Sequence, residues 1–294
     1  MVEIVVLSGK GGTGKTSLTA AFAHLSGNHV LCDLDVDAPD LHLLLHPEKF
    51  KSEKFYSGHE ARILPDKCED CGLCRDMCRY GAVIATKSGP RIDPLKCEGC
   101  KVCVSFCPAG AIDFPEKYCG DWYLSDTRFG WMAHAQLFPG EENSGKLVAL
   151  LRNEAKALAE QKGLSKILSD GPPGIGCPVI SSLSGASLAV IVTEPTPSGH
   201  HDLERIIGLC NHFQVPASVI INKFDLNPGI TRKIETLCAS HGLELLGALP
   251  HDEAVVHAMV QGQTITEYRN NAFSETLRQI WSKIEKRTAM AAAA

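Results

Sequence analysis

Two groups of residues in this sequence have types and spacings suited to chemistry: a glycine-rich loop near the N-terminus and a set of closely spaced cysteines. The loop reads GKGGTGKT over residues 9–16 and follows the apolar stretch 2–7. Glycines let backbone N–H groups turn toward phosphate oxygens, and the N-terminus of a following helix adds a positive dipole. The pattern, placed between a strand and a helix, therefore predicts a phosphate-binding loop.

Within this loop, Lys15 is expected to contact the β- and γ-phosphates and to serve catalysis, and the Thr16 hydroxyl is expected to bind Mg²⁺. The other loop residues expected to bind the nucleotide are Gly11, Gly12, Thr13, Gly14 and Ser17. Lys10 is a second lysine at the start of the loop, which a phosphate site within one subunit does not need. The expected ligands are ATP or ADP with Mg²⁺.

The second lysine makes the KGGTGKT loop resemble the MinD/ParA/Mrp and nitrogenase-iron-protein class of P-loop ATPases. The resemblance covers about 1–60 and 145–294. It implies that Lys10 reaches the nucleotide of a partner subunit and acts in catalysis there. A nucleotide-dependent homodimer, or a heterodimer with a paralogous chain, is the implied assembly.

Other segments match motifs of the same family. The DLD segment ending at Asp35 resembles the first switch segment, which implies that Asp35 orients the attacking water. The DGPPG segment beginning with Asp170 resembles the Walker B and second switch segment, which implies that Asp170 belongs to the Mg²⁺ shell. The turn at Asn222 and the loop beginning at Pro250 resemble the family's two adenine-contacting segments.

The cysteines form two nearly identical stretches, KCEDCGLCRDMCRYGAV and KCEGCKVCVSFCPAGAI. Both have the C-x₂-C-x₂-C-x₃-C spacing of bacterial ferredoxins that carry two [4Fe–4S] clusters, in which the fourth cysteine ligates the other cluster. One predicted ligand set is therefore Cys68, Cys71, Cys74 and Cys107, and the other is Cys97, Cys100, Cys103 and Cys78.

Zinc is the competing interpretation, because paired C-x₂-C units also bind zinc. Zinc does not need a third and fourth cysteine at this spacing twice over, with Pro108 after one of them. Arg79 follows Cys78 where ferredoxins have a proline, which predicts an altered cluster environment and not a lost cluster. Cys177, just past the second switch segment, lies outside the pattern, and its role stays open.

The elements that must position these residues alternate along the chain. Strands are expected at 2–7, 29–32, 167–168, 188–192, 218–221 and 245–249, with helices between them, as in a parallel sheet with crossover helices. A helix over 145–161 is expected to be capped by Asn143 or Ser144, and a hairpin is expected over 122–137. The last helix is expected to pack its apolar face on the sheet.

The expected fold class is α/β: a mostly parallel sheet flanked by helices, of the deviant Walker A type, with a small inserted α+β ferredoxin-like domain. The expected domains are 1–60 and 118–294 for the ATPase, and 61–117 for the insertion.

Composition excludes several other classes of protein. The net charge is −5 with no basic run, so nucleic acid is not an expected partner. No apolar stretch approaches the ~20 residues of a membrane helix, and the last helix balances its basic residues with acids, so no stable membrane insertion is expected. Clustered cysteines without an export signal indicate a cytoplasmic protein.

The two motifs together favour an ATP-hydrolysing protein that couples dimer switching to electron transfer toward an unidentified redox partner. An iron–sulfur carrier or assembly ATPase, as the Mrp relatives suggest, is the alternative. Carriers of that group hold a labile cluster on a C-x₂-C pair in the ATPase part, and this chain has no such pair there. A MinD-like positioning ATPase is a third hypothesis, which leaves the cysteines unexplained.

Overall fold

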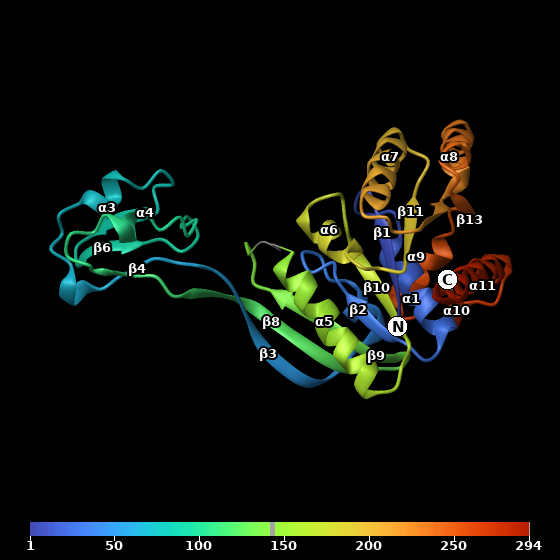
Figure 1. Ribbon diagram of the computed structural model, residues 1–294, viewed down its shortest axis with the longest axis horizontal. Helices are drawn as coiled ribbons and strands as arrows, with labels where there is room; N and C mark the ends of the chain where they lie inside the picture. The colour runs from blue at the N-terminus through green and yellow to red at the C-terminus, as the bar shows by residue number, and fades with distance from the viewer. Residues whose placement is uncertain (142–144, 294) are drawn as a thin grey trace. The chain divides into compact units, whose positions relative to one another are not determined.

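The computed structural model describes residues 1–141 and 145–293, so the expected capping residues Asn143 and Ser144 lie outside the described part (Figure 1). The chain divides into two compact units. The larger unit comprises Met1–Glu53, Asp121–Leu137 and Glu142–Ala294, and the smaller comprises Lys54–Gly120 and Phe138–Glu141. The smaller unit thus extends beyond residues 61–117 at both ends.

The larger unit is built on a sheet whose strand order, among the described residues, is β13-β12-β11-β1-β10-β2-β9-β8-β3. Residues 54–59 of β3 and 116–120 of β8 belong to the smaller unit. Neighbouring strands from β13 to β9 are parallel. The strands are β1 (Val2–Ser8), β2 (Val30–Asp33), β3 (Glu48–His59), β8 (Glu116–Thr127), β9 (Gly130–Leu137), β10 (Lys166–Pro173), β11 (Leu188–Thr193), β12 (Ala217–Asn222) and β13 (Glu244–Leu249).

Helices cover both faces of this sheet, as Figure 1 shows. They are α1 (Lys15–Ser26), α2 (Leu41–Leu45), α5 (Lys146–Gln161), α6 (Cys177–Leu183), α7 (Pro197–His212), α8 (Pro228–Ser240), α9 (Glu253–Val260), α10 (Ile265–Tyr268) and α11 (Ala272–Ala293). Among the described residues, none of the helices combines the length and the apolar character of a transmembrane span. The predicted α/β class with a mostly parallel sheet is confirmed.

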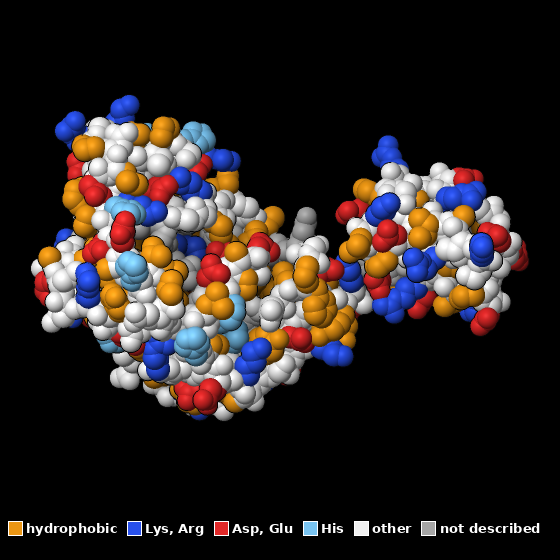
Figure 2. Space-filling view, turned by 180° about the vertical axis from the view of Figure 1, so that it is seen from behind, with side chains coloured by type: hydrophobic (Ala, Val, Ile, Leu, Met, Phe, Trp, Pro, Cys, Tyr) orange, Lys and Arg blue, Asp and Glu red, His pale blue; other side chains and the backbone are white. Residues whose placement is uncertain are grey.

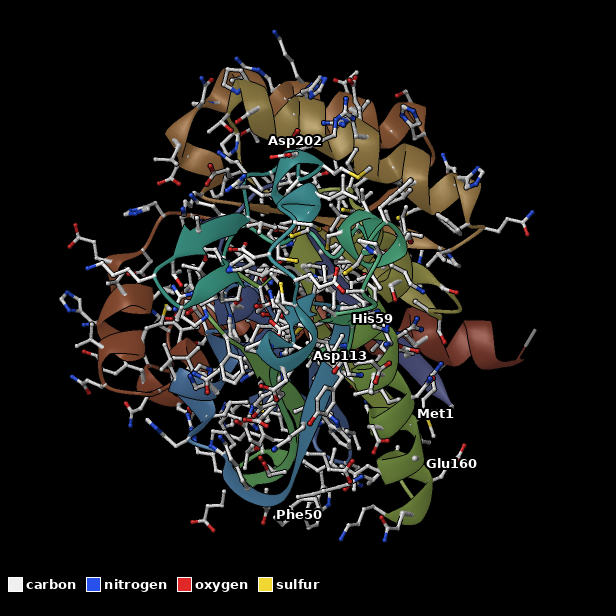
Figure 3. All side chains as sticks on the ribbon, turned by 90° about the vertical axis from the view of Figure 1, so that its left-hand side faces the viewer. Met1, Phe50, His59, Asp113, Glu160 and Asp202 are labelled. Carbon is white, nitrogen blue, oxygen red and sulfur yellow. The ribbon has the colours of Figure 1, made fainter. Side chains whose placement is uncertain are left out.

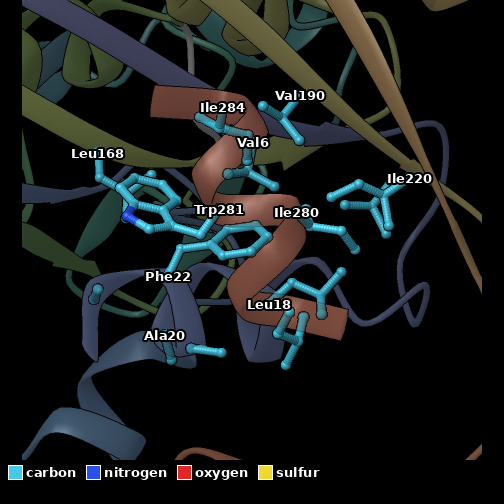
Figure 4. Packing of buried hydrophobic residues seen from close by; sticks show 14 of the residues in the cluster. Val6, Leu18, Ala20, Phe22, Leu168, Val190, Ile220, Ile280, Trp281 and Ile284 are labelled. Carbon is cyan, nitrogen blue, oxygen red and sulfur yellow. The ribbon is translucent and has the colours of Figure 1, made fainter. Parts of the chain in front are cut away.

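The hydrophobic core has a layer on each face of the sheet, because the central strands are buried on both sides. Ile4 and Val6 of β1 pack with α1 and α11, whereas Val5 and Leu7 pack with α6, α7 and α8. On the first face Trp281 of α11 stacks on Phe22 of α1, with ring centroids 5.4 Å apart (Figure 4). The last helix therefore packs on the sheet as predicted.

All six predicted strands form, and β8 and β9 form the predicted hairpin. Strand β3 was not predicted. Its sequence, EKFKSEKFYSGH, contains many charged residues, and most of its side chains are exposed. It lies at the edge of the sheet, where exposed and charged side chains are tolerated. Lysines on an edge strand also disfavour pairing with another sheet.

The smaller unit contains two short antiparallel pairs, β4 (Arg62–Ile63) with β7 (Ile112–Asp113) and β5 (Val83–Thr86) with β6 (Gly89–Ile92). Two short helices, α3 (Leu73–Asp76) and α4 (Val102–Ser105), each begin inside a cysteine repeat. Its small buried core consists of Ala61, Ala82, Val83, Ile92 and Ile112. His59, labelled in Figure 3, stacks on Phe114 of the same unit.

A buried histidine in the β8–β9 hairpin predicts a pH dependence of stability. Burial, and then the positive charges of Lys49 and His42, lower the pKa of His134 from 6.5 to about 4. In the unfolded chain this histidine binds a proton below about pH 6.5, whereas in the folded protein it stays neutral down to about pH 4. The free energy of unfolding therefore keeps its full value above pH 6.5 and falls by about 1 kcal/mol per pH unit as the pH drops toward 4. Urea unfolding of wild type and His134→Gln at pH 4.5–7.5 checks this, and equal slopes for both would contradict it.

Candidate functional site

The glycine-rich loop connects β1 to α1, as the sequence predicts, and two of its glycines have backbone angles that favour glycine. Gly12 has φ +79° and Gly14 has φ +87°. A Cβ on Gly14 would lie 2.5 Å from Nδ2 of Asn222, which itself donates a hydrogen bond to the Thr13 carbonyl at 2.8 Å. The end of β12 therefore holds the loop in place, and only glycine fits this close approach.

Lys15 lies among carboxylate side chains at the carboxyl ends of the central strands. Its side chain is 5% exposed, and its Nζ is 3.0 Å from Oδ1 of Asp170 and 3.2 Å from Oδ2 of Asp35. Strand order explains the arrangement: β10 lies between β1 and β2, which places Asp170 in register with Asp33. Asp170 also accepts hydrogen bonds from Thr16 at 2.7 Å and Thr19 at 2.9 Å.

Around Lys15 the carboxyl groups outnumber the single lysine. Burial alone would lower the pKa of Lys15, but the charges of Asp170 and Asp35 raise it. Burial and the charge of Asp170 raise the pKa of Asp33 well above its ordinary value, and Oδ2 of Asp33 is buried with no hydrogen-bond partner in the described chain. Three carboxyl groups around one lysine, with the Thr16 hydroxyl beside them, are a donor set that suits Mg²⁺.

A cavity of about 390 Å³ opens in front of the loop. Its lining includes Asp35 and nine of the predicted nucleotide-binding residues: Gly11, Gly12, Thr13, Gly14, Lys15, Thr16, Ser17, Asn222 and Pro250. Asp170 does not line it, because it is fully buried behind Lys15 and Thr16. Apolar side chains from α9 and α11, such as Met259 and Phe273, line another part of the cavity.

Lys10 does not line this cavity. It forms an ion pair with Glu194 and donates a hydrogen bond to Oγ1 of Thr196 at 3.2 Å. Lys223 contacts the same carboxylate at 3.3 Å and also donates to the Gly12 carbonyl at 3.2 Å. Burial of Glu194 opposes its ionisation, but hydrogen bonds and charges from Lys10 and Lys223 outweigh it and lower the pKa of Glu194.

Sequence reasoning missed three polar residues of this site: Thr19, Glu194 and Lys223. The signal for Glu194 is its position directly after β11, because ligands bind at the carboxyl ends of parallel strands. It lies beside the loop because β11 pairs with β1. Asp202 of α7, labelled in Figure 3, approaches the loop so closely that a Cβ on Gly9 would lie 2.2 Å from its Cβ.

The structure brings the eight patterned cysteines together in two groups. One cavity is lined by Cys68, Cys71, Cys74 and Cys107, and another by Cys78, Cys97, Cys100 and Cys103. Each group combines three cysteines of one repeat with the fourth of the other. The thiols of Cys78 and Cys107 accept equivalent hydrogen bonds of 3.3 Å, from the amides of Ala82 and Ala111.

Cysteines outside the repeats are in different surroundings. Cys32, Cys119, Cys210 and Cys238 are buried, whereas Cys177 is exposed at the start of α6. Among the described residues, no three His, Cys, Asp or Glu side chains converge on the position of a single metal ion.

Acidic and basic side chains are interspersed over the face of the molecule drawn in Figure 2.

Comparisons with known proteins agree with this architecture. The profile described as "CobQ/CobB/MinD/ParA nucleotide binding domain" matches residues 4–265. An uncharacterized protein of Methanocaldococcus jannaschii is 32% identical over 97% of this chain and 97% of its own length. A cytosolic Fe-S cluster assembly factor, the Nubp1 homolog of Drosophila sechellia, is 30% identical over 41% of this chain and 45% of its own.

Among solved structures, the MinD cell division protein of Aquifex aeolicus has the same fold. It is 20% identical with a TM-score of 0.57, covering 97% of this chain and 98% of that one. The match to the family profile includes the glycine-rich loop, Asp35, Asp170, Asn222 and Pro250. The chain therefore belongs to the CobQ/CobB/MinD/ParA family of P-loop nucleotide-binding ATPases.

Proposed function

We propose that this chain is an ATP-hydrolysing iron–sulfur protein that carries two [4Fe–4S] clusters and couples nucleotide-dependent dimer switching to electron transfer toward a redox partner. The observation that carries the proposal is the pair of cysteine-lined cavities, each with three thiols from one repeat and one from the other. This exchange of the fourth ligand is the arrangement of two-cluster ferredoxins.

The chemistry of the donor set fits such clusters. Four thiolates are the soft ligands that iron–sulfur clusters take. A cubane cluster is wider than one ion and holds its four thiolates farther apart, which agrees with the lack of a single-ion site among the described residues. Bound clusters would supply sites that gain and lose single electrons.

Iron removal supplies a test of this fit. The smaller unit has only a small apolar core, against which five of the patterned cysteines pack, and units of this size usually need a staple such as bound metal. Chelation of iron is expected to unfold the smaller unit and to leave the larger one intact. Hydrogen exchange followed by mass spectrometry checks this, and unchanged protection over residues 61–115 would contradict it.

The larger unit supports ATP hydrolysis through residues that already lie at the loop. Phosphates entering the cavity compete with Asp35 and Asp170 for Lys15. Once Lys15 contacts the phosphates, Asp170 and Thr16 are available to Mg²⁺. Asp35 then loses its cation and can accept a hydrogen bond from the attacking water, which is the role that the family resemblance implies.

A dimer is part of the proposal because Lys10 lies outside the cavity of its own chain and pairs with Glu194. In a dimer, Lys10 could instead contact the nucleotide that is bound to the partner subunit. Contacts that form only with ATP would favour the dimer over the monomer. The free energy of this switch cannot exceed the difference between the affinities of the two states for ATP. Sedimentation with ADP and with a non-hydrolysable ATP analogue distinguishes a homodimer, a heterodimer with a co-purifying paralogous chain, and a monomer.

The direct test of the proposed function is anaerobic purification. About eight irons and eight sulfides per chain are expected, since each cubane holds four of each. A pull-down with and without the ATP analogue then captures the redox partner in one nucleotide state. Zinc in place of iron would overturn the assignment.

A second candidate function is iron–sulfur cluster assembly, which the partial match to the Nubp1 homolog favours. A carrier must release its cluster, whereas an electron-transfer protein retains it. Mixing iron-55-labelled protein with a cluster-free ferredoxin and ATP separates the two: transfer of the label supports assembly, and retention supports electron transfer.

A further inference from the structure

A second cavity of the larger unit, of about 290 Å³, lies apart from the nucleotide site and shares none of its lining residues. It is formed by α2 and the residues that follow it, and by the β8–β9 hairpin. The side chains that give it its character are His42, His46, Lys49, Tyr123 and His134. It also shares no lining residue with the two cysteine-lined cavities.

The lining is rich in hydrogen-bond donors and carries the positive charge of Lys49. It contains three histidines, one lysine, one tyrosine and Gln136, and it contains no aspartate or glutamate. Within the described chain Lys49 forms no ion pair, and its Nζ lies 3.4 Å from the ring centroid of Tyr123. A cation would be repelled by Lys49, and no metal-ion geometry is present among the described residues.

His134 is the most deeply placed of these groups, with 4% of its surface exposed. One ring nitrogen, Nε2, is 2.8 Å from Oγ of Ser125, which fixes the orientation of the ring. The charges of Lys49 and His42 contribute to the lowered pKa of His134, second to burial, so both groups act on the same small volume. A fixed imidazole, the Lys49 ammonium and the His42 side chain thus surround one space.

We propose that this cavity binds a small organic anion, whose carboxylate or phosphate group is held by Lys49 together with His42 and His134. Charge-assisted hydrogen bonds from lysine are strong ligands for such groups, and the N–H of a neutral imidazole can donate a further hydrogen bond. The volume is near the lower limit of small-molecule pockets, roughly 300 Å³, and exceeds what a lone phosphate fills. Pro47, Ala135 and the Tyr123 ring supply apolar surface for the carbon part of the ligand.

Calorimetric titration of the full-length holoprotein, saturated with ADP and Mg²⁺ to occupy the loop, tests this site. Two probes distinguish the two anion sources: succinate for carboxylates and 3-phosphoglycerate for phosphate esters. At least one is expected to bind with a millimolar or lower dissociation constant. Lys49→Gln and His42→Gln are each expected to weaken binding at least tenfold.

Lys51→Gln is the matched control, because Lys51 is on the same strand but pairs with Glu154 and does not line the cavity. Its probe affinity is expected to equal that of wild type, and ADP affinity should be the same in all variants, which shows that they are folded. Absence of binding by both probes would overturn the proposal. Equal affinity of Lys49→Gln and wild type would overturn it as well.

Discussion

Replacing Cys78 by alanine is expected to remove the cluster bound by Cys97, Cys100 and Cys103, and to spare the one bound by its own repeat. The reason is geometric, because Cys78 lines the cavity of the other repeat's three cysteines. Iron is expected to fall from about eight to about four atoms per chain. Iron and sulfide analysis, with electron paramagnetic resonance spectra of the reduced protein, measures the loss.

Two variants make this result specific. Cys107→Ala is the mirror image and should remove the cluster of Cys68, Cys71 and Cys74. Cys177→Ala removes an exposed cysteine outside both cavities and should leave the iron content unchanged. If Cys78→Ala instead lost the cluster of its own repeat, the assignment of ligands would be wrong.

Replacing Lys10 by alanine is expected to lower the rate of ATP hydrolysis by about 10²–10³-fold, the usual cost of removing one transition-state donor. ATP affinity and iron content should remain near wild type, because Lys10 does not line its own chain's cavity. The ATP-dependent dimer should be lost at the same time. Turnover, nucleotide titration and sedimentation measure the three properties on one preparation.

Glu194→Gln separates a role across the dimer from a role within the chain, because it removes the carboxylate that forms an ion pair with Lys10 and keeps the lysine. If Lys10 acts on the partner's nucleotide, this variant should retain hydrolysis. If Lys10 only orders its own loop through Glu194, both variants should lose activity equally. Near-normal turnover by a monomeric Lys10→Ala protein would also defeat the dimer mechanism.

The sequence predicted those features that depend on short segments. The loop between β1 and α1 follows from its own glycines, and the central strands follow from continuous apolar runs that are buried on both faces. Sequence spacing also predicted which four cysteines line each cavity, because the two repeats carry the same internal geometry. The binding of clusters in these cavities remains a proposal.

Features that depend on which strands become neighbours were not predicted. Glu194 contacts Lys10 because β11 pairs with β1. Burial raises the pKa of Asp33 most, and the charge of Asp170 adds to this because β10 places Asp170 in register with it. Strand β3 was missed because an exposed edge strand lacks the alternation of apolar and polar residues that identifies half-buried strands. The anion cavity joins α2 with the β8–β9 hairpin, which are far apart in sequence.

In the proposed function, nucleotide state and cluster chemistry are coupled in one chain. A redox titration of the anaerobic protein, followed by electron paramagnetic resonance, measures this coupling when it is run once with ADP and Mg²⁺ and once with a non-hydrolysable ATP analogue. Coupling is reciprocal, so clusters linked to the nucleotide switch must change their midpoint potentials between the two states. We predict two [4Fe–4S] clusters per chain with different potentials in the two titrations; the absence of cluster signals, or identical potentials with both nucleotides, would contradict the account.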